Sequence, residues 1–246
     1  MSRDRVTLQG FNNLTKTLNI NLFDFHIART DAERRRYVEE LDDRYSAAKI
    51  TEILREIARQ IDAEVLSVSA QDYEPQGASS LMLMSDRGHA SVGAHLTKSH
   101  LCAHTYPDCS DPRGVCTFRV DIEVATCGTI VPLRALDYLL RSFDNDVVVI
   151  DYIVRGFTRA ADGRRVTMDH KVRSIQDFIE PALVGAYQCE DLVLQAENIW
   201  QTKLMRSELR PIDYFFTPFD GEVPADRAAL EDLRRDMVGT FYGWPG

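Results

Sequence analysis

The chain of 246 residues is long enough for one large domain or two small ones, and its 44% hydrophobic content is ordinary for a protein with a packed core. A formal net charge of -9, with no basic run, argues against nucleic acid as the main partner. Because the N-terminus has no apolar signal region and no stretch is long enough to span a membrane, we expect a cytoplasmic protein without a membrane partner.

The first half of the chain predicts strands on either side of one long helical segment. Acidic residues before an apolar pattern at helical spacing predict a helix from Thr30 to about Gln60, with a break near Asp43–Tyr45 and Thr30 or Asp31 as its cap. Apolar residues at alternate positions predict strands. The predicted strands are VTLQG (5–9), LNINLFDF (18–25), EVLSVSA (64–70) and SSLMLMS (79–85), the last two joined by the Pro/Gly connection QDYEPQGA.

In the second half, a helix is predicted over 132–143, with Pro132 in its first turn. Strands are expected at 99–105, 117–126 and 147–157, and DGRR (162–165) forms a turn from which VTMDHKV pairs back. Beyond residue 174 the pattern is interpreted as mostly helical, through IQDFI, ENIWQTKLM and, after a cap around Pro224–Asp226, AALEDLRRDMVGTFY. The prediction is a single α+β domain over 1–246: a two-layer α/β sandwich with a mostly antiparallel sheet and a helical C-terminal extension.

The segment HLTKSHLCAHTYPD (95–108) contains three of the six histidines around one serine. One interpretation is a polar strand end with hydrogen-bonded histidines, and another is a zinc site. The zinc ligands would be His95, His100, Cys102 and His104, but the spacing fits no familiar zinc pattern. A catalytic role has a geometric difficulty, because Ser99 and His104 point to opposite faces of a straight strand and can meet only if the strand bends or bulges.

The five cysteines are an odd number in a chain without a targeting signal, which predicts reduced thiols. On spacing alone, each is expected to be a buried structural thiol. They are Cys102, Cys109, Cys116, Cys127 and Cys189.

Several separate motifs, in order, resemble the longer bacterial subgroup of S-adenosylmethionine decarboxylase proenzymes. The strongest are KSHLCAHTYPD and, downstream, TFRVDIEVATCG. The others are GFNNLTKTL, QDYEPQGAS (71–79), DYIVRGFTR (151–159) and ENIWQTK (197–203). The resemblance covers most of the chain and weakens at 86–94 and after about residue 205.

The resemblance implies that the chain makes its own cofactor. The Ser99 hydroxyl attacks the carbonyl of Lys98 to give an ester, and a base then removes the Cα proton of Ser99. This releases 1–98 as the smaller (beta) chain and leaves 99–246 as the larger (alpha) chain, with residue 99 converted to a pyruvoyl group. His104 matches the processing base, a role that suits an imidazole. Ser79 matches a serine that supports processing.

The resemblance also implies how substrate is handled. The amine of S-adenosylmethionine forms a Schiff base with the pyruvoyl ketone, and carbon dioxide is lost. Cys127 matches the proton donor, whose proton must reach the substrate carbon, because protonation on the cofactor side inactivates the enzyme. Tyr73 matches an aromatic residue that stacks on adenine. Asp108 falls where many relatives carry a glutamate for the ribose hydroxyls, so its shorter side chain leaves that contact open.

The implied product is the aminopropyl donor for spermidine synthesis, and the implied partners are S-adenosylmethionine, the chain's own cleaved beta chain and further copies in a homo-oligomer. Stimulation by Mg²⁺ is also implied, although no metal site can be identified from the residues. Three alternatives remain: a pyruvoyl-dependent ornithine or arginine decarboxylase, an unprocessed regulatory homologue and a zinc-binding structural protein. The presence of Ser99, His104 and Cys127 counts against the regulatory homologue.

Overall fold

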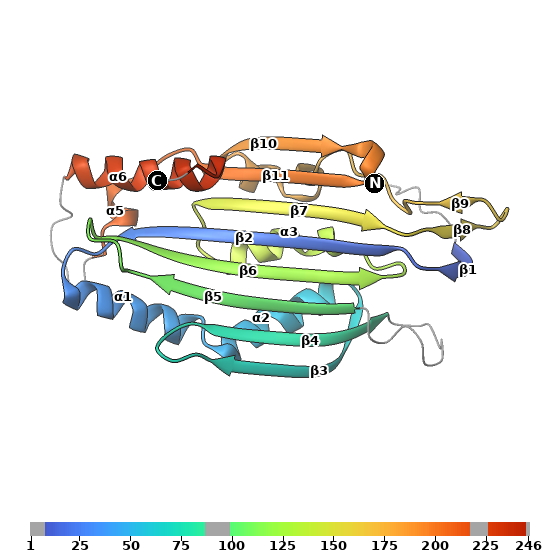
Figure 1. The fold of residues 1–246 in the computed structure, drawn as a ribbon, viewed down its shortest axis with the longest axis horizontal. Helices are drawn as coiled ribbons and strands as arrows, with labels where there is room; N and C mark the ends of the chain where they lie inside the picture. Colours follow the sequence, from blue (N-terminus) through green and yellow to red (C-terminus); the bar gives the residue numbers. More distant parts are fainter. Residues whose placement is uncertain (1–7, 87–98, 217–225, 245–246) are drawn as a thin grey trace.

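A computed structural model describes residues 8–86, 99–216 and 226–244, with side chains described from Asn13 onward and not at Asp86. Its main element is an antiparallel sheet of eight strands (Figure 1). In spatial order these are β10 (Tyr187–Leu194), β11 (Ile199–Arg206), β7 (Val147–Arg155), β2 (Thr15–Ile27), β6 (Val115–Cys127), β5 (Ser99–Asp108), β4 (Ala78–Asp86) and β3 (Ala63–Asp72). A small second sheet contains β1 (Leu8–Asn12), β8 (Thr158–Ala160) and β9 (Arg165–Val166).

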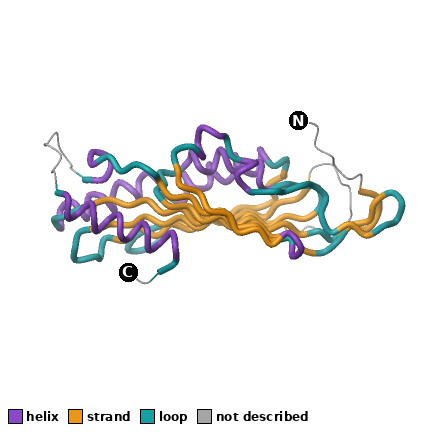
Figure 2. Tube along the Cα trace, turned by 90° about the horizontal axis from the view of Figure 1, so that it is seen from above, coloured by secondary structure: helices purple, strands orange, loops and turns teal. Residues whose placement is uncertain are grey.

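Helices lie on both sides of the large sheet (Figure 2). The longer ones are α1 (Asp31–Arg44), α2 (Ala47–Gln60), α3 (Leu136–Ser142) and α6 (Arg227–Tyr242). The short ones are η1 (Pro132–Ala135), η2 (Ile175–Phe178), α4 (Pro181–Val184), η3 (Gln195–Glu197) and α5 (Pro211–Tyr214). No helix among the residues described is both long and apolar enough to cross a membrane.

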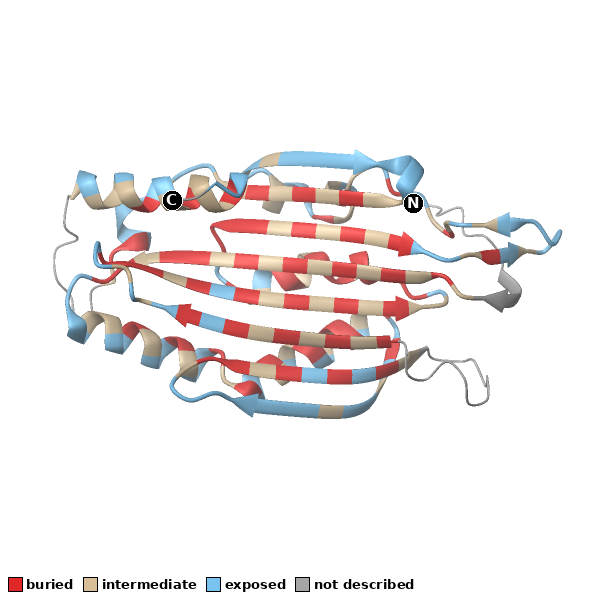
Figure 3. Cartoon of the chain, viewed as in Figure 1, coloured by how far each residue is buried: buried red, intermediate tan, exposed pale blue. Residues whose placement is uncertain are grey.

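The sheet buries one face along most of its length, and the period of two along each strand decides which side chains take part. In β2, for example, Leu18, Ile20 and Leu22 are fully buried in the core beneath α1, α2 and α3, whereas the residues between them are only half-buried. Figure 3 shows this alternation on all the central strands. Each such aliphatic side chain contributes about 1.5–3 kcal/mol when buried.

Among the described residues, the opposite face is covered only at one end. There Phe25 and Val147 pack with Leu233, Met237 and Phe241 of α6 in a second, smaller cluster. The rest of this surface, which we call the open face, carries the half-buried and exposed side chains of the central strands (Figure 3).

The helical region before β3 confirms the predicted long helix, its cap and its break. Thr30 is the N-cap of α1: its side chain accepts a hydrogen bond from the Glu33 amide, and the Glu33 side chain accepts from the Thr30 amide. The helix ends at Arg44, and α2 begins after Ser46. The helix predicted over 132–143 is also confirmed, with a 3-10 first turn at Pro132.

The prediction for the C-terminal region was partly wrong. ENIWQTKLM is not a helix, because Ile199–Arg206 forms β11 and pairs with β7 and with β10, a strand that was not predicted. The reason is a period of two: Trp200, Thr202 and Leu204 are buried at alternate positions. The helical segment predicted at IQDFI is the single 3-10 turn η2, and the one long helix described beyond residue 174 is α6, which Asp226 caps by accepting from the Ala229 amide.

The hairpin predicted around DGRR exists but is short. Arg165 and Val166 pair with Arg159 and Thr158, and the strand ends there. The predicted strand at 5–9 is described only from Leu8 onward, as β1, so its first residues lie outside the described part. The α+β class and the mostly antiparallel sheet are confirmed.

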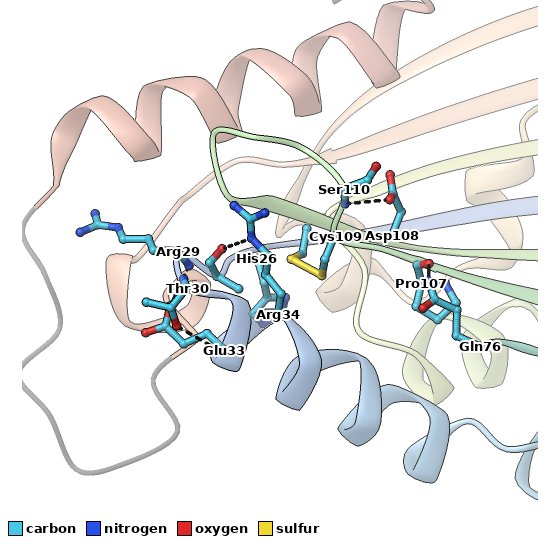
Figure 4. The surroundings of a disulfide bond; sticks show 12 residues. His26, Arg29, Thr30, Glu33, Arg34, Gln76, Pro107, Asp108, Cys109 and Ser110 are labelled. Atoms are coloured by element: carbon cyan, nitrogen blue, oxygen red, sulfur yellow. Dashed lines mark hydrogen bonds between the residues drawn. A yellow bond between two sulfur atoms is a disulfide. The ribbon is translucent and has the colours of Figure 1, made fainter.

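The expectation that every cysteine is reduced is wrong for two of the five. Cys109 and Cys116 form a disulfide bond, shown in Figure 4. They lie on either side of the turn between β5 and β6, which brings their Cα atoms within 4.3 Å. Cys102, Cys127 and Cys189 are free thiols.

Candidate active site

The first residue of β5 and the last residue of β6 meet at one end of the sheet (Figure 1). The two strands are antiparallel, with His100 opposite Ala125, so the register brings Ser99 beside the last two residues of β6, Thr126 and Cys127. Ser99 Oγ lies 3.4 Å from Cys127 Sγ and accepts a hydrogen bond from the Cys127 amide at 3.3 Å. Ser99 is only 2% exposed. A buried hydroxyl and a free thiol are thus in contact.

This contact places a weakly acidic S–H beside whatever group residue 99 carries. A thiol can donate a proton over one hydrogen-bond length, so Cys127 is positioned for acid chemistry at residue 99. Gly128, which follows it, has φ +71°, a conformation that other residues rarely adopt. The chain therefore turns sharply away from β6 directly after the thiol. Lys98 lies outside the described residues.

His104 is not brought to Ser99 within one chain. The register between β5 and β6 is continuous from His100 to Asp108, so the bend that contact requires is absent there. Ser99 is buried, whereas His104 is half-buried on the open face. Five residues of strand separate them by about 16 Å. The contact between Ser99 and His104 was predicted to require a bend or bulge, and the strand between them has neither.

Ser79 lies with His104 rather than with Ser99. The two are direct partners in the register between β4 and β5. Asp121 of β6 is the register partner of His104 on its other side. Ser79, His104 and Asp121 thus form a polar row across three strands of the open face, and His104 also stacks on Tyr106 with ring centroids 6.3 Å apart.

The two residues predicted to bind substrate lie still farther from Ser99. Tyr73 follows β3, is 37% exposed, and its amide donates to the carbonyl of Gly77 at 2.8 Å. Asp108 ends β5, is exposed, and its Oδ1 accepts from the Ser110 amide at 3.0 Å (Figure 4). Nine residues of strand place Asp108 about 30 Å from Ser99. Both therefore belong to the end of the sheet that is opposite Ser99.

The described structure does not support the zinc site, because the proposed ligands that it describes are not arranged to bind a metal ion. His100 Nε2 lies 2.8 Å from Glu123 Oε1, so that ring already has a carboxylate partner. Burial, with Glu123 nearby, raises the pKa of the Cys102 thiol and disfavours the thiolate that a metal needs. Within the described ranges no group of three or more His, Cys, Asp or Glu side chains is placed to hold a metal ion, and His95 lies outside them.

A lysine that the sequence analysis did not single out lies beside Cys127. Lys16 is fully buried, and its Nζ donates to the carbonyls of Gly128 at 2.9 Å and Ile130 at 3.0 Å. It also forms an ion pair with Asp169 Oδ2 at 2.6 Å. The signal was present in TKTLNINL, where Lys16 has the same alternation phase as the apolar Leu18. A lysine at a core position requires buried partners.

Comparison with known proteins identifies the family of the chain. Residues 39–156 match the family model for S-adenosylmethionine decarboxylase. The proteins named S-adenosylmethionine decarboxylase proenzyme from Marinobacter nauticus and Pseudoalteromonas translucida are 42% and 43% identical to this chain. The matches cover 97% and 98% of this chain, and 97% and 96% of those proteins.

A relative from a third bacterium gives a similar result. The S-adenosylmethionine decarboxylase proenzyme of Clostridium beijerinckii is 40% identical over 98% of this chain and 97% of its own length. The solved adenosylmethionine decarboxylase of Aquifex aeolicus is 18% identical, with a TM-score of 0.34, over 66% of this chain and 100% of that one. On the strength of the near-full-length matches at 40–43% identity, the chain belongs to the S-adenosylmethionine decarboxylase family.

Proposed function

We propose that the protein is a self-processing, pyruvoyl-dependent decarboxylase. It converts S-adenosylmethionine to carbon dioxide and S-adenosyl 3-(methylsulfanyl)propylamine, the aminopropyl donor for spermidine biosynthesis. The relatives are named as proenzymes of this activity. The observation that carries the proposal for this chain is the contact between Ser99 Oγ and Cys127 Sγ at the paired ends of β5 and β6.

In this proposal Ser99 Oγ attacks the carbonyl carbon of Lys98, and the ester that forms is then opened by loss of the Ser99 Cα proton. The ester oxygen leaves with Lys98 as a carboxylate, giving chains 1–98 and 99–246. The sheet explains why these would remain together: β2 from the first chain pairs along its whole length with β6 of the second, and from Thr15 to Phe23 with β7. The interleaved strands support a single domain.

The pyruvoyl group formed at residue 99 would supply an electron sink for the loss of carbon dioxide. The surroundings of Ser99 fit such a group, because residue 99 is buried and a free thiol lies within 3.4 Å of its side chain. Cys127 holds the proton that must be delivered to the substrate carbon. Burial of residue 99 excludes water, which would otherwise compete as the proton source.

Replacing the thiol tests this role. We expect Cys127→Ala to leave the protein folded but to reduce turnover by about a hundredfold or more, because general acid catalysis contributes at least that factor. Decarboxylation and the mass of the 99–246 chain are measured together. Cys189→Ala, which removes a free thiol in the remote strand β10, is the matched control. Equal turnover in the two variants would exclude Cys127 as the donor.

We further propose that His104 acts across an interface between two copies of the chain. About 16 Å of straight strand separates it from Ser99 of its own chain, so a processing base at this position must approach the Ser99 of another. The row containing Ser79 and His104 lies on the open face, beside the 42% exposed Leu81 and 39% exposed Leu83 of β4. Such a surface favours a homo-oligomer paired through the open face.

The same pairing would let Tyr73 and Asp108 contribute to binding. Both lie at the His104 end of the sheet, and Tyr106, 46% exposed, offers a second ring there. Aromatic faces attract the positive sulfonium of the substrate and stack on its adenine. Asp108 would receive the ribose hydroxyls. For Mg²⁺ the described residues offer no matching cluster of ligands, and no step is assigned to it.

The test of the proposed function combines intact mass with substrate choice. Two masses matching 1–98 and 99–246, the larger one lacking one ammonia relative to a serine-started chain, are expected for the purified protein. Carbon dioxide is then expected from S-adenosylmethionine and not from ornithine or arginine. A single full-length mass after incubation at neutral pH would contradict self-processing. Release of carbon dioxide from a basic amino acid alone would establish the alternative substrate.

A further inference from the structure

Cys127 is the last residue of β6, and the sheet alone does not fix its position. Its backbone pairs with Thr15 of β2, and its amide donates to Ser99 Oγ. The next residue turns away with φ +71°. The placement of the thiol therefore depends on what holds the turn that follows it, residues 128–130.

Lys16 holds that turn. Its ammonium is fully buried and donates to the carbonyls of Gly128 and Ile130, two residues apart on the same turn. The backbone of Lys16 is the direct register partner of Thr126, the residue before Cys127. The Lys16 side chain thus links the turn to strand β2, on the face of the sheet that the helices cover.

The buried charge of Lys16 is balanced by Asp169, which is itself held. Asp169 Oδ2 accepts from Lys16, and Oδ1 lies 2.7 Å from His170 Nδ1. His170 Nε2 in turn lies 3.1 Å from the hydroxyl of Tyr152. Burial by itself would raise the pKa of Asp169, yet the bonds from His170 and Lys16 lower it, so the carboxylate is charged at neutral pH.

Self-processing makes this network more important. On the proposed route, the Ser99 oxygen leaves with Lys98 as part of a carboxylate, so the Cys127 amide loses the acceptor it has in the uncleaved chain. The contacts of Lys16 with Gly128 and Ile130 involve none of the atoms that depart. They are therefore available to keep Cys127 in place in the processed enzyme.

We infer that Lys16, neutralised by Asp169, is a positioning residue that holds the turn 128–130 and thereby aims the Cys127 thiol at the substrate carbon. This inference rests on the proposed function for the role of the thiol. If the aim is lost, the proton arrives at the cofactor carbon instead. The substrate nitrogen then stays on residue 99 as an amine, the product leaves as an aldehyde after addition of water, and the enzyme is inactivated.

The test uses Lys16→Met, which removes the ammonium but keeps the length of the side chain. Hydrogen exchange at the amides of 127–131 is expected to rise about tenfold or more, while exchange in 115–124 of the same strand is unchanged. The fraction of 99–246 chains that acquire the amine per turnover, read from the mass of the N-terminal peptide, is expected to rise by a similar factor. Lys203→Met is the matched control, since Lys203 donates to the Phe241 carbonyl far from the turn.

Two further variants keep the test informative if Lys16→Met folds poorly. Asp169→Asn keeps the shape and should give the same local changes more weakly, and Lys16→Arg should restore the low inactivation fraction. A uniform rise of exchange over the whole sheet, or an inactivation fraction equal to that of Lys203→Met, would overturn the inference. Hydrogen exchange is also measured with Lys16→Met in the Ser99→Ala chain, which is not cleaved. The effect of Lys16 on the turn can then be seen even if the wild-type chain never self-processes. Failure of self-processing would contradict the proposed function, and unchanged exchange at the turn would contradict the role of Lys16.

Discussion

The variant Ser99→Ala is expected to remain a single chain of 246 residues and to lose decarboxylation by about a thousandfold or more. The alanine has no oxygen to attack the Lys98 carbonyl, so neither the cleavage nor the group derived from residue 99 can form. Truncation of this small buried side chain should cost no more than about 1–3 kcal/mol of stability, because it removes only the contacts of Ser99 Oγ with the Cys127 amide and thiol. Intact mass and carbon dioxide release are measured on the same sample.

A buried serine on the neighbouring strand gives a matched control for this loss. Ser80 is 1% exposed, and its hydroxyl lies 2.8 Å from that of Thr51, so Ser80→Ala removes a comparable contact away from the cleavage point. We expect Ser80→Ala to be cleaved and active. If Ser99→Ala is cleaved, or if it retains the activity of Ser80→Ala, residue 99 is not the origin of the cofactor.

The period of apolar residues predicted the fold well where one face of an element is buried. The 3.6-residue period of α1 and α2 and the alternation in β2 correspond to buried faces in the structure. Residues 199–206 were misassigned because ENIWQTKLM contains good helix formers as well as apolar residues at alternate positions. The alternate positions become decisive only when the segment pairs with β7. For a short segment, tertiary pairing overrides local propensity.

The candidate site was predictable in its chemistry and less so in its geometry. Ser99 and Cys127 were identified from motifs, but their contact depends on the register of β5 and β6, which the sequence does not fix. The alternation rule did predict that Ser99 and His104 point to opposite faces. Lys16 was missed because a single lysine within a strand resembles a surface residue until the helix-covered face is known. The disulfide was missed because it depends on a turn.

The separation of Ser99 from His104 leads to the second large expected effect. Neither Ser99→Ala nor His104→Ala should be processed alone, the first for lack of a nucleophile and the second for lack of a base. Co-expressed in equal amounts, the two chains should form mixed pairs in which one site combines an intact Ser99 with an intact His104 from the partner copy. With random two-fold pairing, about half of the His104→Ala chains should then be cleaved. Mass spectrometry distinguishes the chains, because each substitution changes the mass differently.

The identity of the cleaved chain makes this experiment decisive. A base acting across the interface requires that only the His104→Ala chain is cut, since the Ser99→Ala chain can lend its imidazole but has no hydroxyl. Co-expression of His104→Ala with the double variant Ser99→Ala/His104→Ala is the control and should yield no cleavage. If mixed pairs form yet remain uncut, His104 does not act in trans. If His104→Ala alone is processed at the wild-type rate, another group is the base. Cleavage of the His104→Ala chain alone would mean that each β5 strand contributes to two active sites. Its first residue, Ser99, would be the nucleophile of one site, and His104 on its open face would be the base of the other.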